Sequence, residues 1–185
     1  MNFNNHSELS GLHAFLSPSN YHWVNYNPSK LESVYRNQRA KEKGILLHDF
    51  ASVAITNKIK LANHKKALNL FVNDSIGYRM ESEVVLFYSD NAFGTADAIR
   101  FKDDVLMIFD LKTGHGRTSF KQLDIYAALF CLEYGHDPLK ITIEERIYQH
   151  NGYTVNVPIP EEIASNMETI VLFDKQINEI KTTLV

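Results

Sequence analysis

Five apolar residues in a row, Val105 to Phe109, lead directly into Asp110-Leu111-Lys112, and this stretch constrains the fold more than any other. A run of Val, Leu, Met, Ile and Phe without a polar break is typical of a strand that is buried on both faces. Asp110 and Lys112 stand two positions apart, so their side chains point to the same side of such a strand. The sequence therefore predicts a core strand that ends in a carboxylate and an ammonium group on one face.

A second acid, Asp97, interrupts the apolar segment from Phe93 to Phe101, which reads as the preceding strand. The two strands form a hairpin around residues 102–104. Carboxylates on adjacent strands are hard oxygen ligands of the kind that Mg²⁺ and Mn²⁺ prefer, and Lys112 lies beside them. We therefore expect a divalent metal site at Asp97 and Asp110.

Further motifs flank these two acids in a fixed order. Gly44-Ile-Leu-Leu-His48 precedes Gly94-Thr-Ala-Asp97, and Asp110-Leu-Lys-Thr-Gly114 precedes Gln122-x-x-x-Tyr126. With the upstream stretch at 16–23, Leu-Ser-Pro-Ser-Asn-Tyr-His-Trp, the set resembles the motif series of PD-(D/E)XK nucleases of the RecB type. That group includes phage exonucleases and CRISPR-associated exonucleases. The resemblance covers roughly residues 13–150, and its specificity comes from the ordered set, because Asp-x-Lys alone is common.

The resemblance implies an α/β fold of the α+β type with a mixed sheet, a restriction-endonuclease-like core, and N-terminal helices over the active site. It implies four metal ligands, which are His48, Asp97, Asp110 and the carbonyl of Leu111. It implies that Lys112 orients the attacking water and offsets charge on the phosphate. It also implies that Gln122 and Tyr126, four residues apart on one helix face, position Lys112 or a substrate phosphate.

Plainer interpretations remain open for several of these residues. A lone histidine such as His48 in an apolar helical segment is usually structural, Tyr126 would ordinarily be a core residue, and Gln122 would be exposed. Glu83 is the candidate catalytic acid of the first strand, because it stands next to the apolar part of that strand. An exposed edge-strand carboxylate explains Glu83 equally well.

Basic side chains suggest where a nucleic acid would bind. A first set lies on a polar, helix-permissive segment and comprises Arg36, Arg39, Lys41 and Lys43. For any one of them a solvated helix face is the simpler explanation, but together they are candidates for phosphate contact. His115 and Arg117 lie in the glycine-containing connection 113–118, beside the predicted metal site.

Composition bounds the remaining possibilities. The single cysteine, Cys131, cannot hold a four-cysteine cluster, so we expect no iron–sulfur cluster, unlike the CRISPR-associated branch. A net charge of −3 over 185 residues places any DNA contact in local patches. The chain shows no apolar run near the ~20 residues of a membrane span and no signal peptide. We expect one domain over residues 1–185, loosely packed at 1–12, in the cytoplasm of a bacterial or phage-infected cell.

Periodicity predicts the remaining elements. Helices are expected from Ser17-Pro18 to just before Asn27-Pro28, over 29–43, around 46–54, over 63–74 up to Gly77, over 119–134 and over about 161–181. Strands are expected at 79–88 and at 141–148 and 153–157, the last two joined by an Asn151-Gly152 type I′ turn. Two apolar sets are predicted to face the core: Leu46, Leu47, Phe50, Val53 and Ala54, and then Ile163, Met167, Ile170, Val171, Phe173 and Ile177.

The expected function is that of an Mg²⁺- or Mn²⁺-dependent DNA nuclease, an exonuclease in recombination, repair or phage DNA processing. Its expected partners are linear DNA ends or single strands, with a recombination protein or a single-strand-binding protein beside them, and no membrane; a homo-oligomer is left open. The alternative is a nuclease-fold nucleic-acid-binding or accessory protein without cleavage activity. Metal-dependent hydrolysis of small phosphate esters is a further rival, which no P-loop supports. Polarity, exonuclease against endonuclease action, DNA against RNA preference and the number of metals stay undetermined by the sequence.

Overall fold

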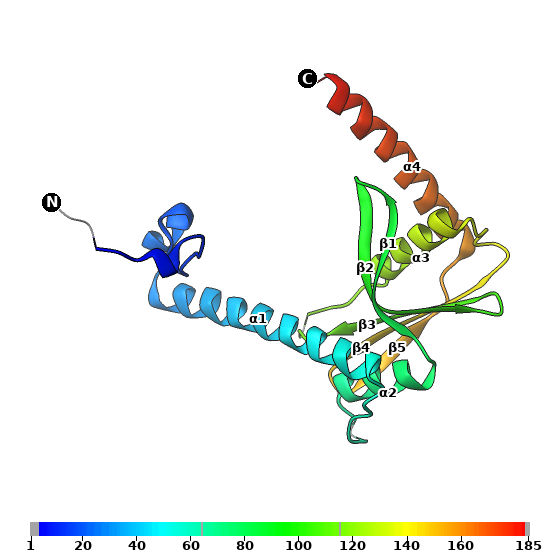
Figure 1. Cartoon of the computed structure of the whole chain (residues 1–185), viewed down its shortest axis with the longest axis horizontal. Coiled ribbons are helices and arrows are strands. Elements are labelled where there is room, and N and C mark those ends of the chain that lie inside the picture. The colour runs from blue at the N-terminus through cyan, green and yellow to red at the C-terminus, as the bar shows by residue number, and fades with distance from the viewer. Residues whose placement is uncertain (1–3, 64, 115, 184–185) are drawn as a thin grey trace. The chain divides into compact units, whose positions relative to one another are not determined.

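The computed structural model describes residues 4–63, 65–114 and 116–183, and the chain divides into two compact units, Met1–Lys43 and Gly44–Val185 (Figure 1). The first unit holds two 3₁₀ segments, Ser7–Leu9 and Pro18–Asn25, and the start of helix α1 (Pro28–Thr56). The second unit contains the rest of α1 and then, in chain order, α2 (Ala67–Gly77), β1 (Glu81–Ser89), β2 (Ala92–Lys102), β3 (Val105–Lys112), α3 (Lys121–Tyr134), β4 (Thr142–Gln149), β5 (Gly152–Asn156) and α4 (Pro160–Thr183).

The strands of the second unit form one mixed sheet in the order β1-β2-β3-β4-β5. The first three strands are an antiparallel meander, β4 runs parallel to β3 after the α3 crossover, and β5 returns antiparallel to β4. The predicted mixed α/β architecture, the meander and the parallel return strand are therefore confirmed.

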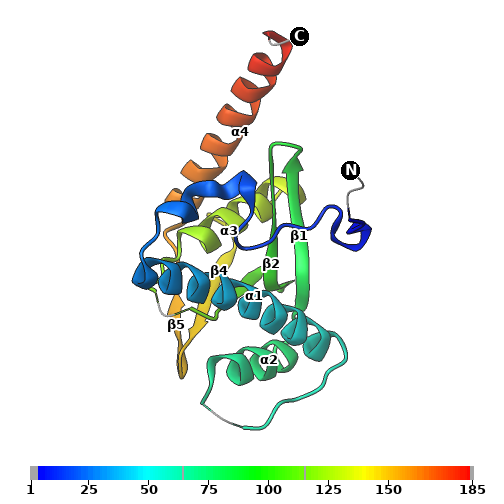
Figure 2. The same cartoon turned by 90° about the vertical axis from the view of Figure 1, so that its left-hand side faces the viewer.

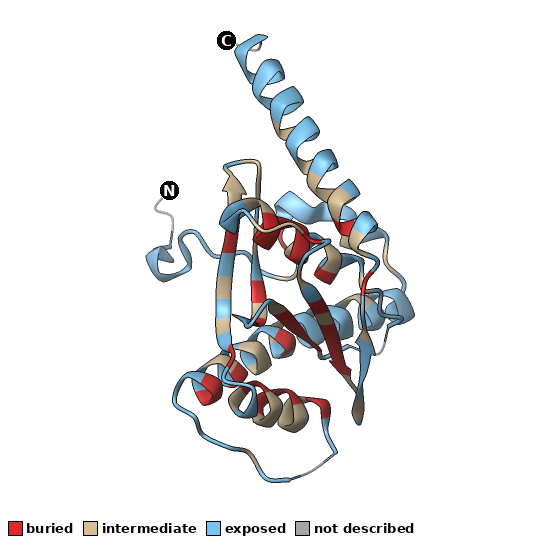
Figure 3. Cartoon of the chain, turned by 90° about the vertical axis from the view of Figure 1, so that its right-hand side faces the viewer, coloured by how far each residue is buried: buried red, intermediate tan, exposed pale blue. Residues whose placement is uncertain are grey.

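Strand β3 is the centre of the core, as its apolar run predicts. Leu106 and Ile108 pack into a cluster with α3, whereas Phe109 and Leu111 pack into a second cluster on the opposite face of the sheet. The second cluster contains residues of α2 and of the C-terminal part of α1, which lie next to each other in Figure 2. Figure 3 shows the buried residues concentrated in β3, β4, α3 and the α1–α2 pair. Because α helices cover both faces, β3 is buried through its whole middle.

Residues with positive φ make two of the turns. Asp103 (φ 52°) and Asp104 (φ 57°) connect β2 to β3, an arrangement that acidic and amide side chains tolerate better than most. The predicted Asn151-Gly152 turn is wrong by one residue. Gln149 pairs directly with Gly152, so the two turn residues are His150, with φ 56°, and Asn151.

Helix α1 corrects two predictions. The segments at 29–43 and 46–54 belong to one continuous helix. The larger apolar residues predicted to face the core are mostly exposed, Leu46 at 68%, Phe50 at 49% and Val53 at 57%. The buried side of the helix carries small residues together with Ile55, as Gly44, Ala51 and Ala54 show. Small side chains let the helix backbone approach the sheet closely, so the larger residues are left on the far side.

Helix α4 packs over only part of its predicted stripe. Ile163, Met167 and Ile170 contact the cluster around α3, but Val171, Phe173 and Ile177 are exposed. Polar contacts take over beyond Ile170. Asp174, for example, accepts hydrogen bonds from Ser89 and Asn91 in the β1–β2 turn.

The remaining boundaries differ by a few residues from those expected. Helix α2 begins at Ala67 rather than near Asn63. The segment after Ser17 is a 3₁₀ helix rather than a regular helix, and Tyr21 and Val24 in it are exposed.

Candidate metal centre

The site lies where β2 separates from β3. Pairing between these strands runs from Lys102↔Val105 to Ala98↔Phe109 and then stops. The backbone N–H of Leu111, two residues further along β3, donates instead to Oδ2 of Asp97 at 2.8 Å. The Asp97 carboxylate thus replaces a missing strand partner. It is held at the point where β2 and β3 separate, between Asp97 and Leu111, which we call the strand fork.

Strand β2 changes its alternation at Asp97. Ala96 packs with the α3 cluster, but Ala98, two positions on, packs with the cluster on the opposite face. Two residues of a regular strand would point to the same face, so β2 bends at Asp97. Figure 1 shows the β1–β2 ribbon turning away from the rest of the sheet.

Strand β1 bends at the matching position. Val84 contacts the α3 cluster, whereas the Ser82 hydroxyl lies 3.1 Å from that of Ser52 on α1. Glu83 between them has φ 54°, a conformation that costs a non-glycine residue energy and is retained when its surroundings impose it. Ser82 pairs with Ala98 and Val84 with Ala96, so Glu83 lies opposite Asp97. Both bends therefore turn their acidic residues toward the same place.

Helix α1 brings the histidine. Gly44, His48 and Ser52 recur every four residues and so share one face of the helix. A Cβ at Gly44 would lie 2.9 Å from Thr113 Oγ1, so a side chain here would force Thr113 or the helix to shift, and glycine allows the close approach to the end of β3. One turn later, His48 Nδ1 lies 3.3 Å from Asp97 Oδ1.

His48, Glu83 and Asp97 together form a group with metal-ligand geometry. One ligand atom from each lies within 4.8 Å of the others. The hydrogen bond that His48 donates to the Asp97 carboxylate is the largest cause that raises the pKa of His48. Partial burial and then the charge of Asp97 raise the pKa of Glu83. A cation at this point would relieve the repulsion between the carboxylates and compete with the proton on His48.

Asp110 and Lys112 form a second part of the site on the neighbouring strand. Lys112 Nζ lies 2.9 Å from Asp110 Oδ1 and donates to Gln122 Oε1 at 2.8 Å. Gln122 Nε2 donates in turn to the Tyr126 hydroxyl at 3.1 Å. The i, i+4 pair on α3 therefore holds the lysine from one side while the aspartate holds it from the other. Gln122 is exposed and Tyr126 packs against the core, so the plainer expectations for them are also met.

Asp110 provides the test of whether these residues fit a metal ion. Asp110 is only 3% exposed, and its Oδ2 atom has no hydrogen-bond partner within the described residues. Burial, followed by the charge of Asp97, raises the pKa of Asp110. A buried carboxylate oxygen without a donor is costly. A divalent cation would satisfy it, and the set of carboxylates with one imidazole is of a type that Mg²⁺ or Mn²⁺ accepts. The residues whose ligand atoms lie within 4.8 Å of one another are His48, Glu83 and Asp97, and these three fit a metal ion. Asp110 lies outside that group, so Asp110 and the Leu111 carbonyl as further ligands stay predictions.

The predicted basic residues fare differently. Arg36 and Arg39 are paired with Glu32 and Glu42, each at 2.7–2.8 Å, within the 1–43 unit. Lys41 and Lys43 are exposed on the same helix segment. Their role in phosphate contact stays a prediction, and His115 lies outside the described residues.

Arg117 lies beside the second part of the site. It lines a cavity of about 350 Å³ together with Lys112, Gln122 and Gln149. Gln149 was not expected from the sequence. It pairs with Lys112 in the sheet register and donates to the carbonyls of Gly114 and Gly116, which anchors the loop after β3. No motif indicated this, because a glutamine at a strand end has no distinctive pattern.

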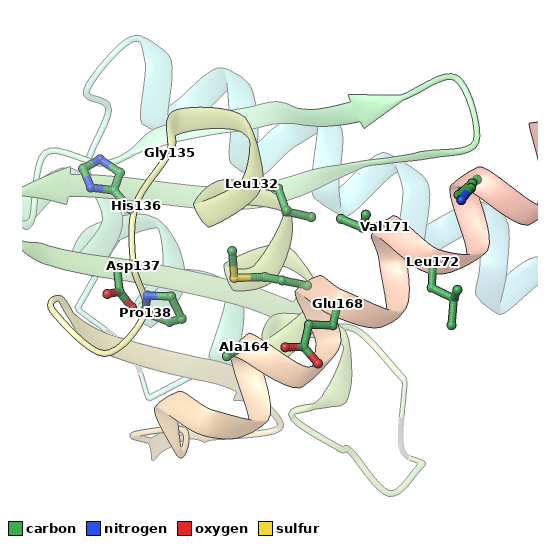
Figure 4. Close-up of a pocket in the computed structure, with 11 residues that line it drawn as sticks. Leu132, Gly135, His136, Asp137, Pro138, Ala164, Glu168, Val171 and Leu172 are labelled. Carbon is green, nitrogen blue, oxygen red and sulfur yellow. The ribbon is translucent and has the colours of Figure 1, made fainter.

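A larger cavity, about 710 Å³, lies elsewhere, between α3 and α4 (Figure 4). Leu132, Pro138 and Met167 are among its mostly apolar lining residues, and none of the residues of the strand-fork site lines it. The largest cavity is the usual first candidate for a ligand site. Here three acids, a histidine and a lysine gather at the strand fork, and the pKa values of His48, Glu83 and Asp110 are raised there, so the fork is the better candidate.

Comparisons with protein-family models, with curated proteins and with solved structures find no match to this chain. None of the helices in the described part of the chain has both the length and the apolar composition needed to cross a bilayer.

Proposed function

We propose that this protein is a metal-dependent nuclease that hydrolyses phosphodiester bonds in DNA. One observation carries the proposal. At the strand fork, ligand atoms of His48, Glu83 and Asp97 lie within 4.8 Å of one another. The buried Asp110, paired with Lys112, lies on the neighbouring strand. A phosphate ester brings negative charge that must be neutralised. A cation held by several acids, with a lysine nearby, can neutralise that charge.

Mg²⁺ or Mn²⁺, held by His48, Glu83, Asp97 and Asp110, would supply Lewis acidity and lower the pKa of a bound water. The chain's own contribution is orientation. Asp97 is fixed by the Leu111 N–H, and Asp110 is fixed by Lys112. These contacts hold the carboxylates in place before a substrate arrives.

Lys112 is the candidate for stabilising the phosphate. Its ammonium group lies between Asp110 and Gln122 and remains about one third exposed, so it can reach a substrate oxygen. An ammonium group in this position offsets the charge that develops on the phosphate in the transition state. Gln122, supported by Tyr126, is a positioning residue that keeps the lysine directed toward the fork.

The topology agrees with the proposal without establishing it. A helix, a three-stranded meander, a crossover helix and a parallel strand follow one another here, which is compatible with the nuclease core that the sequence motifs imply. One fold can serve several functions, however, so the residues and geometry of the strand fork decide which chemistry is possible.

The test is cleavage of end-labelled DNA, linear and circular, single- and double-stranded, with Mg²⁺, Mn²⁺ or EDTA. Wild-type protein is compared with Lys112→Ala and with Lys121→Ala, a matched removal of an exposed lysine at the start of α3. We expect metal-dependent cleavage that Lys112→Ala loses and Lys121→Ala keeps. Loss of linear substrates alone would identify an exonuclease, and cutting of circles an endonuclease. If no DNA is cut under any condition, the proposal fails, and intact DNA binding would then favour an accessory role.

A further inference from the structure

The β1–β2 ribbon beyond the bend has one covered face and one open face. Val84 and Leu86 of β1 point into the cluster around α3. The alternate residues point the other way, and two of them are large aromatic rings, Phe87 at 45% and Phe93 at 62% exposed. These two residues are direct cross-strand partners, with ring centroids 6.3 Å apart and planes inclined by 31°.

The aromatic pair lies on the face of the ribbon that leads to the metal centre. On β2, Phe93 and Thr95 alternate with Gly94 and Ala96, which face α3, and so lie on the open face that leads to the bend at Asp97. Four strand residues span about 13 Å, so the rings lie about that far from the Asp97 carboxylate. Between them lies the uncharged pair Val85↔Thr95.

We propose that Phe87 and Phe93 form a stacking surface for the bases of a single-stranded nucleic acid whose phosphate occupies the strand fork. This inference rests on the proposed function and specifies its substrate. Every base has a π-face, so exposed rings bind single strands without regard to sequence. At about 3.4 Å per stacked nucleotide, a strand of roughly four nucleotides would extend from the fork to the rings.

Two other occupants fit less well. In a duplex the bases are already stacked on their neighbours, so only an end or a displaced strand can offer a free face. A stable protein interface buries about 800 Å² on each partner, more than the open face of two phenylalanines and a valine provides. No basic side chain lies between the fork and the two rings in the described residues of the ribbon, and the Glu133 carboxylate accepts a hydrogen bond from the Phe87 N–H, so the ribbon suits bases while the phosphate lies at the fork.

The test is binding of fluorescein-labelled 12-nucleotide single strands and of a small closed circular duplex with Ca²⁺ as the divalent cation, followed by anisotropy. The Phe87→Ala/Phe93→Ala double variant is compared with wild type and with Phe173→Ala, which removes a similarly exposed ring from α4. We expect the double variant to bind single-stranded DNA and RNA about 10- to 100-fold more weakly. Phe173→Ala should bind as wild type does, and duplex affinity should change less than threefold. Both rings are exposed, so circular dichroism should show an unchanged fold.

A second readout is local. 2-Aminopurine placed near the fourth nucleotide from the cleavage point should change its fluorescence on binding to wild type and not on binding to the double variant. In cleavage assays the double variant should show a raised KM and a nearly unchanged kcat.

The two levels of the proposal fail separately. If metal-dependent cleavage occurs and the double variant binds single strands as tightly as wild type, the stacking surface is refuted and the nuclease proposal stands. Equal weakening of duplex and single-strand binding would also refute it. If nothing is cleaved but single-strand binding still depends on the two rings, the stacking surface stands as a binding site and the nuclease proposal fails.

Discussion

Glu145 on β4 should make the stability of this protein decrease as the pH rises. The residue is fully buried, its Oε2 accepts a hydrogen bond from Asn156, and its side chain interacts with the neighbouring carboxyl of Asp124. Burial, with the neighbouring carboxyl of Asp124, raises the pKa of Glu145 to about 8. The folded chain therefore holds a proton on this side chain that the unfolded chain has lost above its ordinary pKa of 4.5.

The sign of the effect follows from linkage. Between pH 4.5 and pH 8 the folded state binds more protons than the unfolded state, so the free energy of unfolding falls as the pH rises. Each pKa unit corresponds to about 1.4 kcal/mol. Glu145, together with the neighbouring Asp124, would then lower the free energy of unfolding by on the order of a few kcal/mol between pH 5 and pH 9.

Glu145→Gln should abolish most of that slope. The amide keeps the shape and the contact with Asn156 but cannot ionise. We expect urea unfolding at pH 9 to show the variant more stable than wild type by about 2–4 kcal/mol, with little difference at pH 5. Glu168→Gln, at an exposed position on α4, is the control and should follow wild type at every pH. Parallel pH profiles for wild type and Glu145→Gln would refute the reasoning.

Three further predictions concern the site and the fold. Lys112→Ala should leave Mn²⁺ affinity within about threefold of wild type in calorimetry while cleavage falls at least 100-fold, so a large loss of affinity would make Lys112 a metal-site component instead. Gly44→Ala should weaken Mn²⁺ binding, because the added Cβ would lie 2.9 Å from Thr113 Oγ1. The double variant Gly44→Ala/Thr113→Ala should restore Mn²⁺ affinity. If it does not, the clash with Thr113 is not the cause of the loss. Phe50 is exposed and Ile55 is buried on α1. In urea unfolding, Phe50→Gln should therefore change the free energy of unfolding by less than about 1 kcal/mol, whereas Ile55→Ala should lower it by about 2–4 kcal/mol. The reverse order would mean that the other side of α1 faces the core.

Much of the sheet could be predicted because its signals are local. The unbroken apolar run before Asp110 required burial on both faces, and β3 has it. Gly135, with φ 69°, ends α3 where its sequence position indicates. The meander followed from the short turns between strands, and the parallel return followed from the crossover helix.

Helix faces were harder to predict, because hydrophobicity and shape compete. The larger apolar residues near His48 predicted a buried stripe, yet the helix turns its small residues to the sheet, where Gly44 approaches Thr113. The spacing of Gly44 and His48 on one helix face was visible in the sequence, but its reason, a close backbone approach, is a tertiary property.

The candidate site was predicted as a set of residues and not as an arrangement. The sequence placed Asp97 and Asp110 on adjacent strands, but not the paired bends that turn Glu83 and Asp97 toward His48. Those bends depend on β2 leaving β3, which no local pattern reports. Glu145 was missed because a glutamate in an alternating strand usually faces solvent.

The central claim is that the strand fork binds a divalent cation, and Mn²⁺ titration by calorimetry tests it most directly. Wild type is compared with Asp97→Asn, Asp110→Asn and Asp103→Asn, the last a removal of charge from the exposed turn between β2 and β3. We predict saturable binding by wild type and Asp103→Asn, and affinity at least tenfold weaker in the two fork variants. Unchanged Mn²⁺ binding by Asp110→Asn, or no saturable binding by wild type, would contradict the account.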